Sequence, residues 1–377
     1  MNTCTAEFAR LTQNLGGLHC DANPFLTLRN PFGLQSWTMP VIEALLVLGA
    51  IACLVHALRW RRTYGDSSNL VIWISAIVSL LLIEPIAYFP QWFGLQEAMG
   101  LTFVHNAFTV QFLYDRLPLY IVAMYPVYVY VAWVLVQRTG VFRRYNPVVG
   151  AACVAFVFHC LYEVIDHVGV QFRWWVWNED LPTSLPALGV VPYVNIQAFS
   201  LGIPFGLALV TLLICRRRGA GGWILARNVA IVSILVWPIQ AVFSVPAALI
   251  GVLAGSIQTG RLAGTWALII AAGLTTAVAF VGAYRARRAD PTLLLSGVRQ
   301  DYFGLVCVVT YLVAAVAIWG AALPDYLAAH DGSTPAGAPV GSLPYAVVTF
   351  LLSVALTAGA YVGTTARSSS PPAVVAQ

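Results

Sequence analysis

One segment of the chain carries four ionisable side chains at spacings that bring them to one side of a helix. His159, Glu163, Asp166 and His167 lie in an otherwise apolar run. At 100° per residue, these positions fall within roughly a third of the helix circumference. Carboxylic acids and imidazoles can donate, accept and relay protons. We predict catalytic roles for all four, with Glu163 or Asp166 as the general acid and the histidines orienting the carboxyls. The plainer alternative is that Asp166 and His167 only end a membrane span.

Further polar residues in apolar runs are predicted to lie in the same layer of the membrane. Glu84 and Asp115 are predicted catalytic residues that tune the general acid or take up the final proton. Glu84 precedes Pro85, so it could equally be a helix-end residue. The predicted substrate-binding residues of this layer are His105, Asn106 and Asn195. Ionisable groups within a membrane cost free energy and by default indicate a functional site.

Aromatic residues accompany these polar groups. Trp174, Trp175 and Trp177 follow the ionisable helix, and Tyr125 and Tyr128 lie mid-span in an earlier one. Tryptophans at a membrane interface often form only an aromatic belt. That explanation does not cover the mid-span tyrosines. We predict that these five residues bind the substrate.

This combination of groups favours acid-initiated carbocation chemistry on a lipophilic isoprenoid. A carboxylic acid kept away from water stays protonated and can protonate an alkene or an epoxide. Aromatic faces stabilise the cation without attacking it. Cyclisation or hydration would follow, which is lyase or isomerase chemistry. We expect a lipophilic small-molecule substrate drawn from the membrane lipid, with no cofactor and no metal.

Three other functions stay open. Two histidines and two carboxylates on one helix face could bind zinc or iron in a metal-dependent lipid enzyme. Buried carboxylates and proline-broken helices also suit a proton-coupled transporter. A non-enzymatic assembly subunit is the third. Elemental analysis and proton flux in sealed vesicles distinguish the first two from the isoprenoid enzyme.

The composition identifies the class of protein that must position these residues. The 377-residue chain is 59% hydrophobic and 9% charged, whereas soluble domains carry about 25% charged residues. Its apolar runs are continuous and long enough for helices that cross the hydrocarbon core. An all-α polytopic membrane bundle follows, because strands of a barrel would alternate polar and apolar residues.

Nine spanning helices are predicted from the apolar runs. Their ranges are 39–58, 69–89, 117–137, 147–169, 194–215, 224–253, 263–284, 302–323 and 343–363. Pro238 and Pro246 should kink the sixth. The stretch 97–115 is predicted to be a re-entrant or interfacial helix. Gly202-x-x-x-Gly206 and Gly251-x-x-x-Gly255 are candidate close helix contacts.

Arginine placement predicts the orientation. Of the 20 basic residues, all arginine, 15 fall in alternate loops and the tail. The positive-inside rule then puts the N-terminus outside and the C-terminus in the cytoplasm. The same rule explains the net charge of +5 without nucleic-acid binding. The absence of lysine favours a bacterial plasma membrane. His56 and His330 are expected at the interface or in loops.

The predicted organisation has three parts. Residues 1–38 form an extracytoplasmic segment, in which Cys4 and Cys20 could form a disulfide in an oxidising compartment. Residues 39–363 form the helical domain, with pocket-forming helices in 39–253 and scaffold helices in 263–363. Residues 364–377 are predicted to be a disordered cytoplasmic tail.

The chain resembles polytopic isoprenoid-modifying membrane enzymes, namely membrane terpene cyclases and carotenoid hydratases. The resemblance rests on Glu163-Val-Ile-Asp166, then Trp174-Trp175-Val-Trp177, then Val191-Pro192-Tyr193-Val-Asn195, with Glu84-Pro85 and Leu117-Pro118 as earlier echoes. It covers about a third of the chain. It implies protonation of a double bond or epoxide, then cyclisation or capture by water, without a redox cofactor. No aspartate-rich DDxxD motif is present, so ionisation of a diphosphate is not expected.

Overall fold

The protein is an all-α integral membrane bundle in a computed structural model, which describes residues 3–215, 221–290, 294 and 296–362. Within these residues, nine helical segments are long and apolar enough to cross a membrane. All nine coincide with predicted spans. The predicted disordered tail, 364–377, lies outside the described residues, as do Arg216, Arg217, Arg218 and Arg367.

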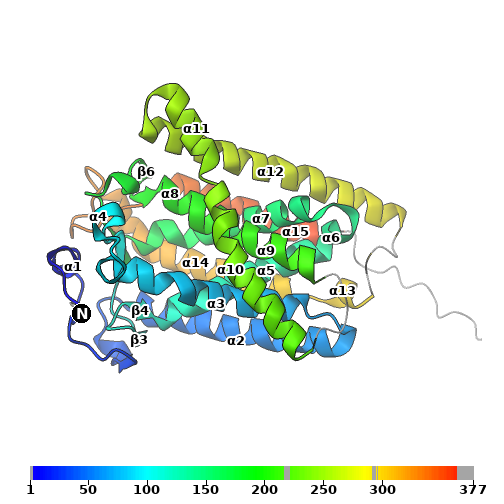
Figure 1. Ribbon diagram of the computed structural model, residues 1–377, viewed down its shortest axis with the longest axis horizontal. Coiled ribbons are helices and arrows are strands. Elements are labelled where there is room, and N and C mark those ends of the chain that lie inside the picture. The colour runs from blue at the N-terminus through cyan, green and yellow to red at the C-terminus, as the bar shows by residue number, and fades with distance from the viewer. Residues whose placement is uncertain (1–2, 216–220, 291–293, 295, 363–377) are drawn as a thin grey trace, which may run out of the picture.

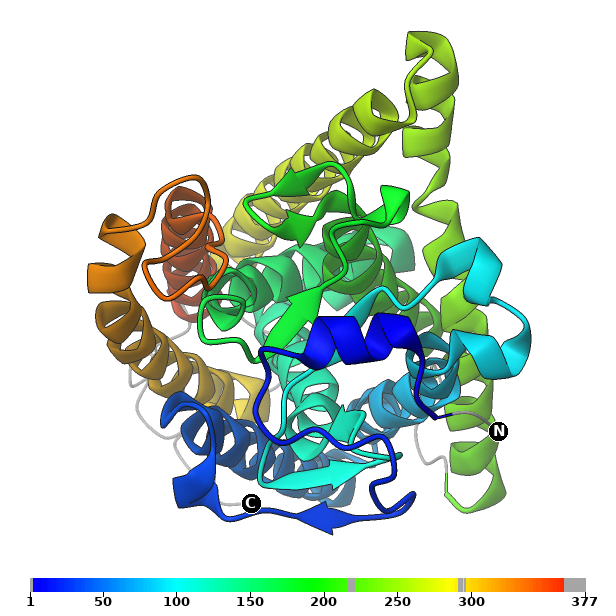
Figure 2. The ribbon, with the colours of Figure 1, turned by 90° about the vertical axis from the view of Figure 1, so that its left-hand side faces the viewer.

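The spanning elements follow the sequence order of the apolar runs. They are α2 (Thr38–Tyr64), α3 (Ser68–Tyr88), α5 (Leu119–Thr139), α7 (Pro147–Gly169), α8 (Tyr193–Asn195) continued by the π-helix η4 (Ile196–Gly202) and α9 (Ile203–Ile214), α10 (Trp223–Val242) with α11 (Val245–Ala254), α12 (Ile257–Ala289), α14 (Phe303–Leu327) and α15 (Leu343–Tyr361). Helices α5 and α7 are the most buried and lie at the centre of the bundle in Figure 2. Helices α11 and α12 form a hairpin at its edge (Figure 1).

The short elements gather mainly at one end of the bundle (Figure 1). They are α1 (Ala6–Thr12), α4 (Gln96–Met99), and the strands β1 (Thr27–Leu28), β2 (Phe103–His105), β3 (Val110–Phe112), β4 (Leu117–Pro118), β5 (Trp175–Trp177), β6 (Ala187–Leu188) and β7 (Val191–Pro192). We call residues 3–37, 89–118, 170–192 and 328–342 the cap. Two further short helices, α6 (Val141–Arg144) and α13 (Ser296–Gln300), lie at the other, arginine-rich end.

The stretch 97–115 is not the predicted re-entrant helix. After α4 it forms strands β2 and β3, and β3 joins β1 and β4 in an antiparallel sheet of order β1-β3-β4. Strand β2 pairs with β5, far along the chain. Backbone groups of the cap therefore form hydrogen bonds by strand pairing between distant segments. Periodicity within one segment does not reveal such pairing.

Prolines and glycines explain the other local features. The sixth span, predicted to be kinked at Pro238 and Pro246, breaks between α10 and α11 just before Pro246, whereas Pro238 lies inside α10. Gly202 and Gly206 pack against α10, which confirms the first glycine motif. In the second, Gly251 packs against α12, but Gly255 ends α11 in the left-handed conformation and makes no close contact. Cys4 and Cys20 are joined by a disulfide.

The connection between α14 and α15 is pressed onto the end of α7. A Cβ atom at Gly341 would lie 2.3 Å from the His167 carbonyl oxygen. The next residue, Ser342, donates its backbone N–H to His167 Nδ1 at 3.0 Å. A glycine is therefore required here by close backbone approach.

We predict that Gly341→Ala destabilises the protein by about 1–3 kcal/mol, the usual cost of overpacking. Thermal unfolding of purified protein in detergent measures it. Gly320→Ala is the matched control, because nothing lies within 4 Å of a Cβ there. Equal melting temperatures of the two variants would contradict the close approach.

Candidate functional site

A small cavity lies where the cap meets the helices. It has a volume of about 30 Å³, room for about two water molecules. Its lining comes from α3, β2, α5, α7, β5 and the start of the fifth span. The lining residues are Glu84, Phe103, His105, Ile121, Met124, Tyr125, Tyr162, Trp175, Trp177, Asn195 and Phe199. We call it the outer cavity.

The β2–β5 ladder supplies one aromatic wall. Phe103 pairs with Trp177, and His105 pairs with Trp175. Opposed residues of an antiparallel pair share a face, and successive residues alternate between faces. All four therefore point to the outer cavity, while Val104, between them, packs on the other side in the core around α1. Trp175 and Trp177 therefore form one face of strand β5 and do more than contribute to an interfacial aromatic belt.

The helices supply the remaining walls and one carboxyl group. Glu84, on the last turn of α3, is 2% exposed, and its Oε2 has no hydrogen-bond partner among the described residues. Tyr125 of α5 lies within electrostatic reach of both Glu84 and Asp166. The indole N–H groups of Trp175 and Trp177 are also buried without a described partner. The outer cavity thus combines aromatic faces with a carboxyl group and unpaired donors.

Behind Glu84, a tyrosine connects it to a histidine. The Tyr88 hydroxyl contacts the Glu84 carboxyl and lies 2.7 Å from His105 Nδ1. Burial lowers the pKa of His105 from 6.5 to about 3, so this imidazole is neutral at physiological pH. A neutral imidazole offers one N–H donor and one acceptor nitrogen, so it can orient the Tyr88 hydroxyl. Tyr88 was not among the predicted site residues, although it lies one turn after Glu84.

The four residues of α7 form a second, adjoining cluster. Glu163 lies between two histidines, with Oε1 3.5 Å from His159 Nδ1 and Oε2 3.4 Å from His167 Nε2. His167 Nδ1 accepts a backbone N–H, so the proton of the neutral ring is on Nε2 and faces Glu163. All three are at most 1% exposed. The predicted convergence on one helix face is present, but Glu163 does not line the outer cavity.

Partners from other helices hold the His159 side chain of this cluster in place. His159 Nδ1 is 2.6 Å from Ser200 Oγ, and His159 Nε2 is 2.8 Å from the Tyr345 hydroxyl. Tyr345 belongs to α15, which the sequence placed among the scaffold helices. Neither Ser200 nor Tyr345 is singled out by any local motif, so a helix wheel of α7 alone could not have found them.

Asp166 connects this cluster to the outer cavity. Its Oδ2 accepts a hydrogen bond from Asn195 Nδ2 at 3.0 Å, and it contacts the Tyr162 hydroxyl. Both Asn195 and Tyr162 line the outer cavity. Asp166 therefore stands directly behind the cavity wall, and Asn195, a predicted substrate-binding residue, forms part of that wall.

The structure places other predicted residues elsewhere. Asp115 forms an ion pair with Arg29 in a left-handed turn of the cap, with φ of 61°. Asn106 donates to Gln35 Oε1 and to the Arg173 carbonyl. Both residues hold the cap together and are not among the residues that line the outer cavity.

Two aromatic residues also lie outside this cavity. The Trp174 indole donates to Thr38 Oγ1 at 3.0 Å. Tyr128 packs edge-on against Tyr162 and Tyr311, with ring centroids 5.9 and 5.3 Å away. Neither lines the outer cavity, although Tyr128 adjoins its wall through Tyr162.

A third polar group lies near the arginine-rich end. His56, expected at the interface or in a loop, lies within α2, about two turns before its end. Its Nε2 is 3.1 Å from Asp301 Oδ2, and its Nδ1 is 2.7 Å from the Tyr130 hydroxyl. His330 does lie in a loop, the α14–α15 connection. Among the described residues, no group of three or more histidine, cysteine or acidic side chains is arranged to hold a metal ion.

Comparisons with known proteins give no relative. No family model, no curated protein and no solved structure matches the chain.

The buried His105 predicts loss of stability in acid. Its folded pKa lies below its unfolded value, so the unfolded chain binds a proton first as the pH falls. The stability that depends on neutral His105 is complete above about pH 6.5 and is lost between there and about pH 3.

We expect the melting temperature of His105→Asn to fall less than that of the unmodified protein between pH 7 and pH 4. Thermal unfolding in detergent measures this. The exposed His19 provides the control variant His19→Asn, which should follow the unmodified protein. Parallel curves for all three proteins would contradict a buried neutral His105.

Proposed function

We propose that the protein is a membrane enzyme that protonates an alkene or epoxide at one end of a lipophilic isoprenoid, in the manner of terpene cyclases and hydratases. The proposal rests on one observation, an aromatic-lined cavity whose polar groups include a buried carboxyl and unpaired N–H donors. It also agrees with the resemblance carried by Glu163–Asp166, Trp174–Trp177 and Val191–Asn195. We place the enzyme in a bacterial plasma membrane with its N-terminus outside.

Glu84 is the proton donor in this proposal, in place of Glu163 or Asp166. It lines the outer cavity, whereas Asp166 stands behind Asn195 and Glu163 lies between two histidines. The Glu84 O–H bond breaks as a C–H bond, or an O–H bond of an epoxide, forms. The carbocation then loses a proton or takes up water, and either path returns one proton to the site. No oxidant, cofactor or metal is required.

The walls of the outer cavity suit a cation. Phe103, Tyr125, Tyr162, Trp175 and Trp177 present aromatic rings from different segments. A cation within about 6 Å of such rings is stabilised by their quadrupoles, most strongly where water is excluded. The rings cannot capture the cation as water would, so rearrangement can precede quenching.

The volume of the outer cavity limits the substrate. About 30 Å³, the room of about two water molecules, admits only the last carbon atoms of a branched hydrocarbon and neither a whole isoprene unit nor a polyprenyl chain. The rest of the substrate would lie beyond Trp177 and Phe199, the partly exposed members of the wall. This arrangement suits attack at a terminal isoprene unit.

Substitution of Glu84 tests the proposal. Protein in lipid nanodiscs is incubated with geranylgeraniol in deuterium oxide, and mass spectrometry detects carbon-bound deuterium in the product. Glu84→Gln should lower the rate at least about 100-fold, as expected for loss of a general acid. Glu97→Gln, at an exposed site in the cap, is the matched control.

Two outcomes would contradict the proposal. One is normal turnover by Glu84→Gln. The other is the absence of any product from geranylgeraniol and from its terminal epoxide with the unmodified protein. Turnover that survives Glu84→Gln but not Asp166→Asn would move the proton donor to Asp166.

A second candidate, a proton-coupled transporter, is favoured by the third polar group. The ionisable groups of His56, Tyr130 and Asp301 lie together near the arginine-rich end, whereas Glu84 and Glu163 lie in the halves of α3 and α7 nearer to the cap. Ionisable groups toward both ends of a bundle are what a proton path needs.

We expect that a transporter would acidify sealed vesicles when substrate is added, and a pH-sensitive dye measures this change. The His56→Gln variant should abolish the signal. An unchanged signal with His56→Gln would exclude this path.

A further inference from the structure

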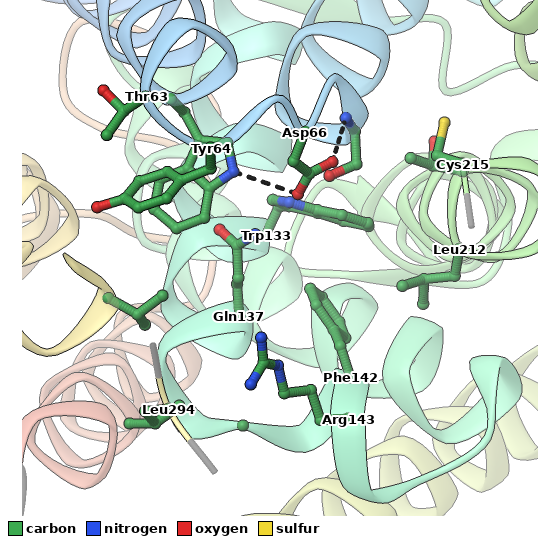
Figure 3. A pocket seen from close by; sticks show the side chains of 15 residues that line it. Thr63, Tyr64, Asp66, Trp133, Gln137, Phe142, Arg143, Leu212, Cys215 and Leu294 are labelled. Atoms are coloured by element: carbon green, nitrogen blue, oxygen red, sulfur yellow. Dashed lines mark hydrogen bonds between the residues drawn. The ribbon is translucent and has the colours of Figure 1, made fainter. Parts of the chain in front are cut away.

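A second, larger pocket opens at the arginine-rich end of the bundle, away from the cap. Its volume is about 460 Å³. Its walls come from the end of α2, the α2–α3 turn, α5, α6, the end of α9, Leu294 and α13. Figure 3 shows these side chains around the opening. We call it the inner pocket, and the function proposed above makes no use of it.

Two aromatic pairs form opposite parts of its lining. Trp60 and Tyr64 stack at a tilt on α2, with ring centroids 4.4 Å apart. Trp133 of α5 and Phe142 of α6 do the same at 4.5 Å. Indole and phenol rings at the end of a span lie at headgroup depth, where one part of a ligand is apolar and the other is wet. The inner pocket is therefore shaped for an amphiphile.

The acidic side chain of the inner pocket is already engaged. Asp66 accepts the Trp60 indole N–H at 3.2 Å and the Ser68 backbone N–H at 2.9 Å (Figure 3). Its carboxylate thus holds the α2–α3 turn. Gln137 exchanges hydrogen bonds with Asn69 at 3.3 and 3.4 Å. Asp66 and Gln137 therefore already have hydrogen-bond partners within the protein. The Asp66 carboxylate does not require a bound cation.

Two further residues of the lining carry hydrogen-bond donors. The Thr211 hydroxyl is fully buried, lines the inner pocket and has no hydrogen-bond partner within the described chain. Arg143 extends from α6 toward Gln137 (Figure 3). A guanidinium group binds phosphate oxygens by paired hydrogen bonds. The chemistry that matches these donors is an anion attached to an apolar body.

We propose that the inner pocket binds an anionic phospholipid. The phosphate is bound by Arg143, a headgroup oxygen accepts the Thr211 hydroxyl, and the hydrocarbon lies against the aromatic pairs. Arginine side chains near the ends of membrane helices bind anionic headgroups by the same principle. A soluble phosphate ester shares the anionic chemistry, but it would leave the aromatic lining uncovered.

Lipid titration of the full-length protein tests the proposal. Protein in neutral detergent is titrated with phosphatidylglycerol, and native mass spectrometry counts the lipid adducts. Arg143→Gln should weaken the tightest adduct about tenfold, the loss of one charge-assisted contact. Arg144→Gln is the matched control, because it removes the same charge from the same short helix outside the pocket lining. Its affinity should be unchanged.

Three comparisons decide the outcome. Thr211→Val, which keeps the side-chain shape, should weaken the adduct severalfold and covers the case in which Arg143→Gln fails to fold. Phosphatidylcholine should bind at least about tenfold more weakly than phosphatidylglycerol. Equal losses in Arg143→Gln and Arg144→Gln, or equal binding of the two lipids, would overturn the proposal. Full displacement by glycerol 3-phosphate would overturn the lipid assignment and indicate a soluble phosphate ester.

Discussion

The cost of removing ionisable groups from water is the constraint on which this molecule depends. A buried charge or polar group costs free energy unless partners within the protein satisfy it. Around α7 this demand recruits four residues from two other segments, the fifth span and the start of α15. Ser200 and Tyr345 hold His159, the backbone of Ser342 holds His167, and Asn195 holds Asp166. The packing of the cap and of α15 onto α7 is thus the structural consequence of placing acids in the membrane.

The same constraint explains why a helical membrane protein has strands. Backbone that is not helical must find its hydrogen bonds elsewhere when water is scarce. The β2–β5 ladder does so, and its two-residue period separates two tasks. Its odd-numbered residues line the outer cavity, while Val104 and Val176 pack against the core around α1. One short ladder thereby closes the cavity and fixes the N-terminal segment.

Membrane helices were predictable because twenty apolar residues in succession leave few alternatives. The convergence of the ionisable residues was predictable in part, since α7 brings its four ionisable residues to one face. The lining of the outer cavity was less predictable from the sequence. Glu84 and Glu163 have the same local signal, an acid in an apolar helix, and only the position of β2 and β5 decides which one lines the cavity. Strand pairing across about 70 residues and partners such as Tyr345 leave no trace in local periodicity.

Helix α5 links the two ends of the molecule. Tyr125 lines the outer cavity, and Trp133 and Gln137 line the inner pocket. At 1.5 Å per residue, Tyr125 and Trp133 are separated by about 12 Å along the axis. Pro126, next to Tyr125, removes one hydrogen bond of the helix and permits bending there. A ligand in the inner pocket could influence the outer cavity only by preferring one bend of α5 over another, because coupling between sites requires a differential affinity for two arrangements.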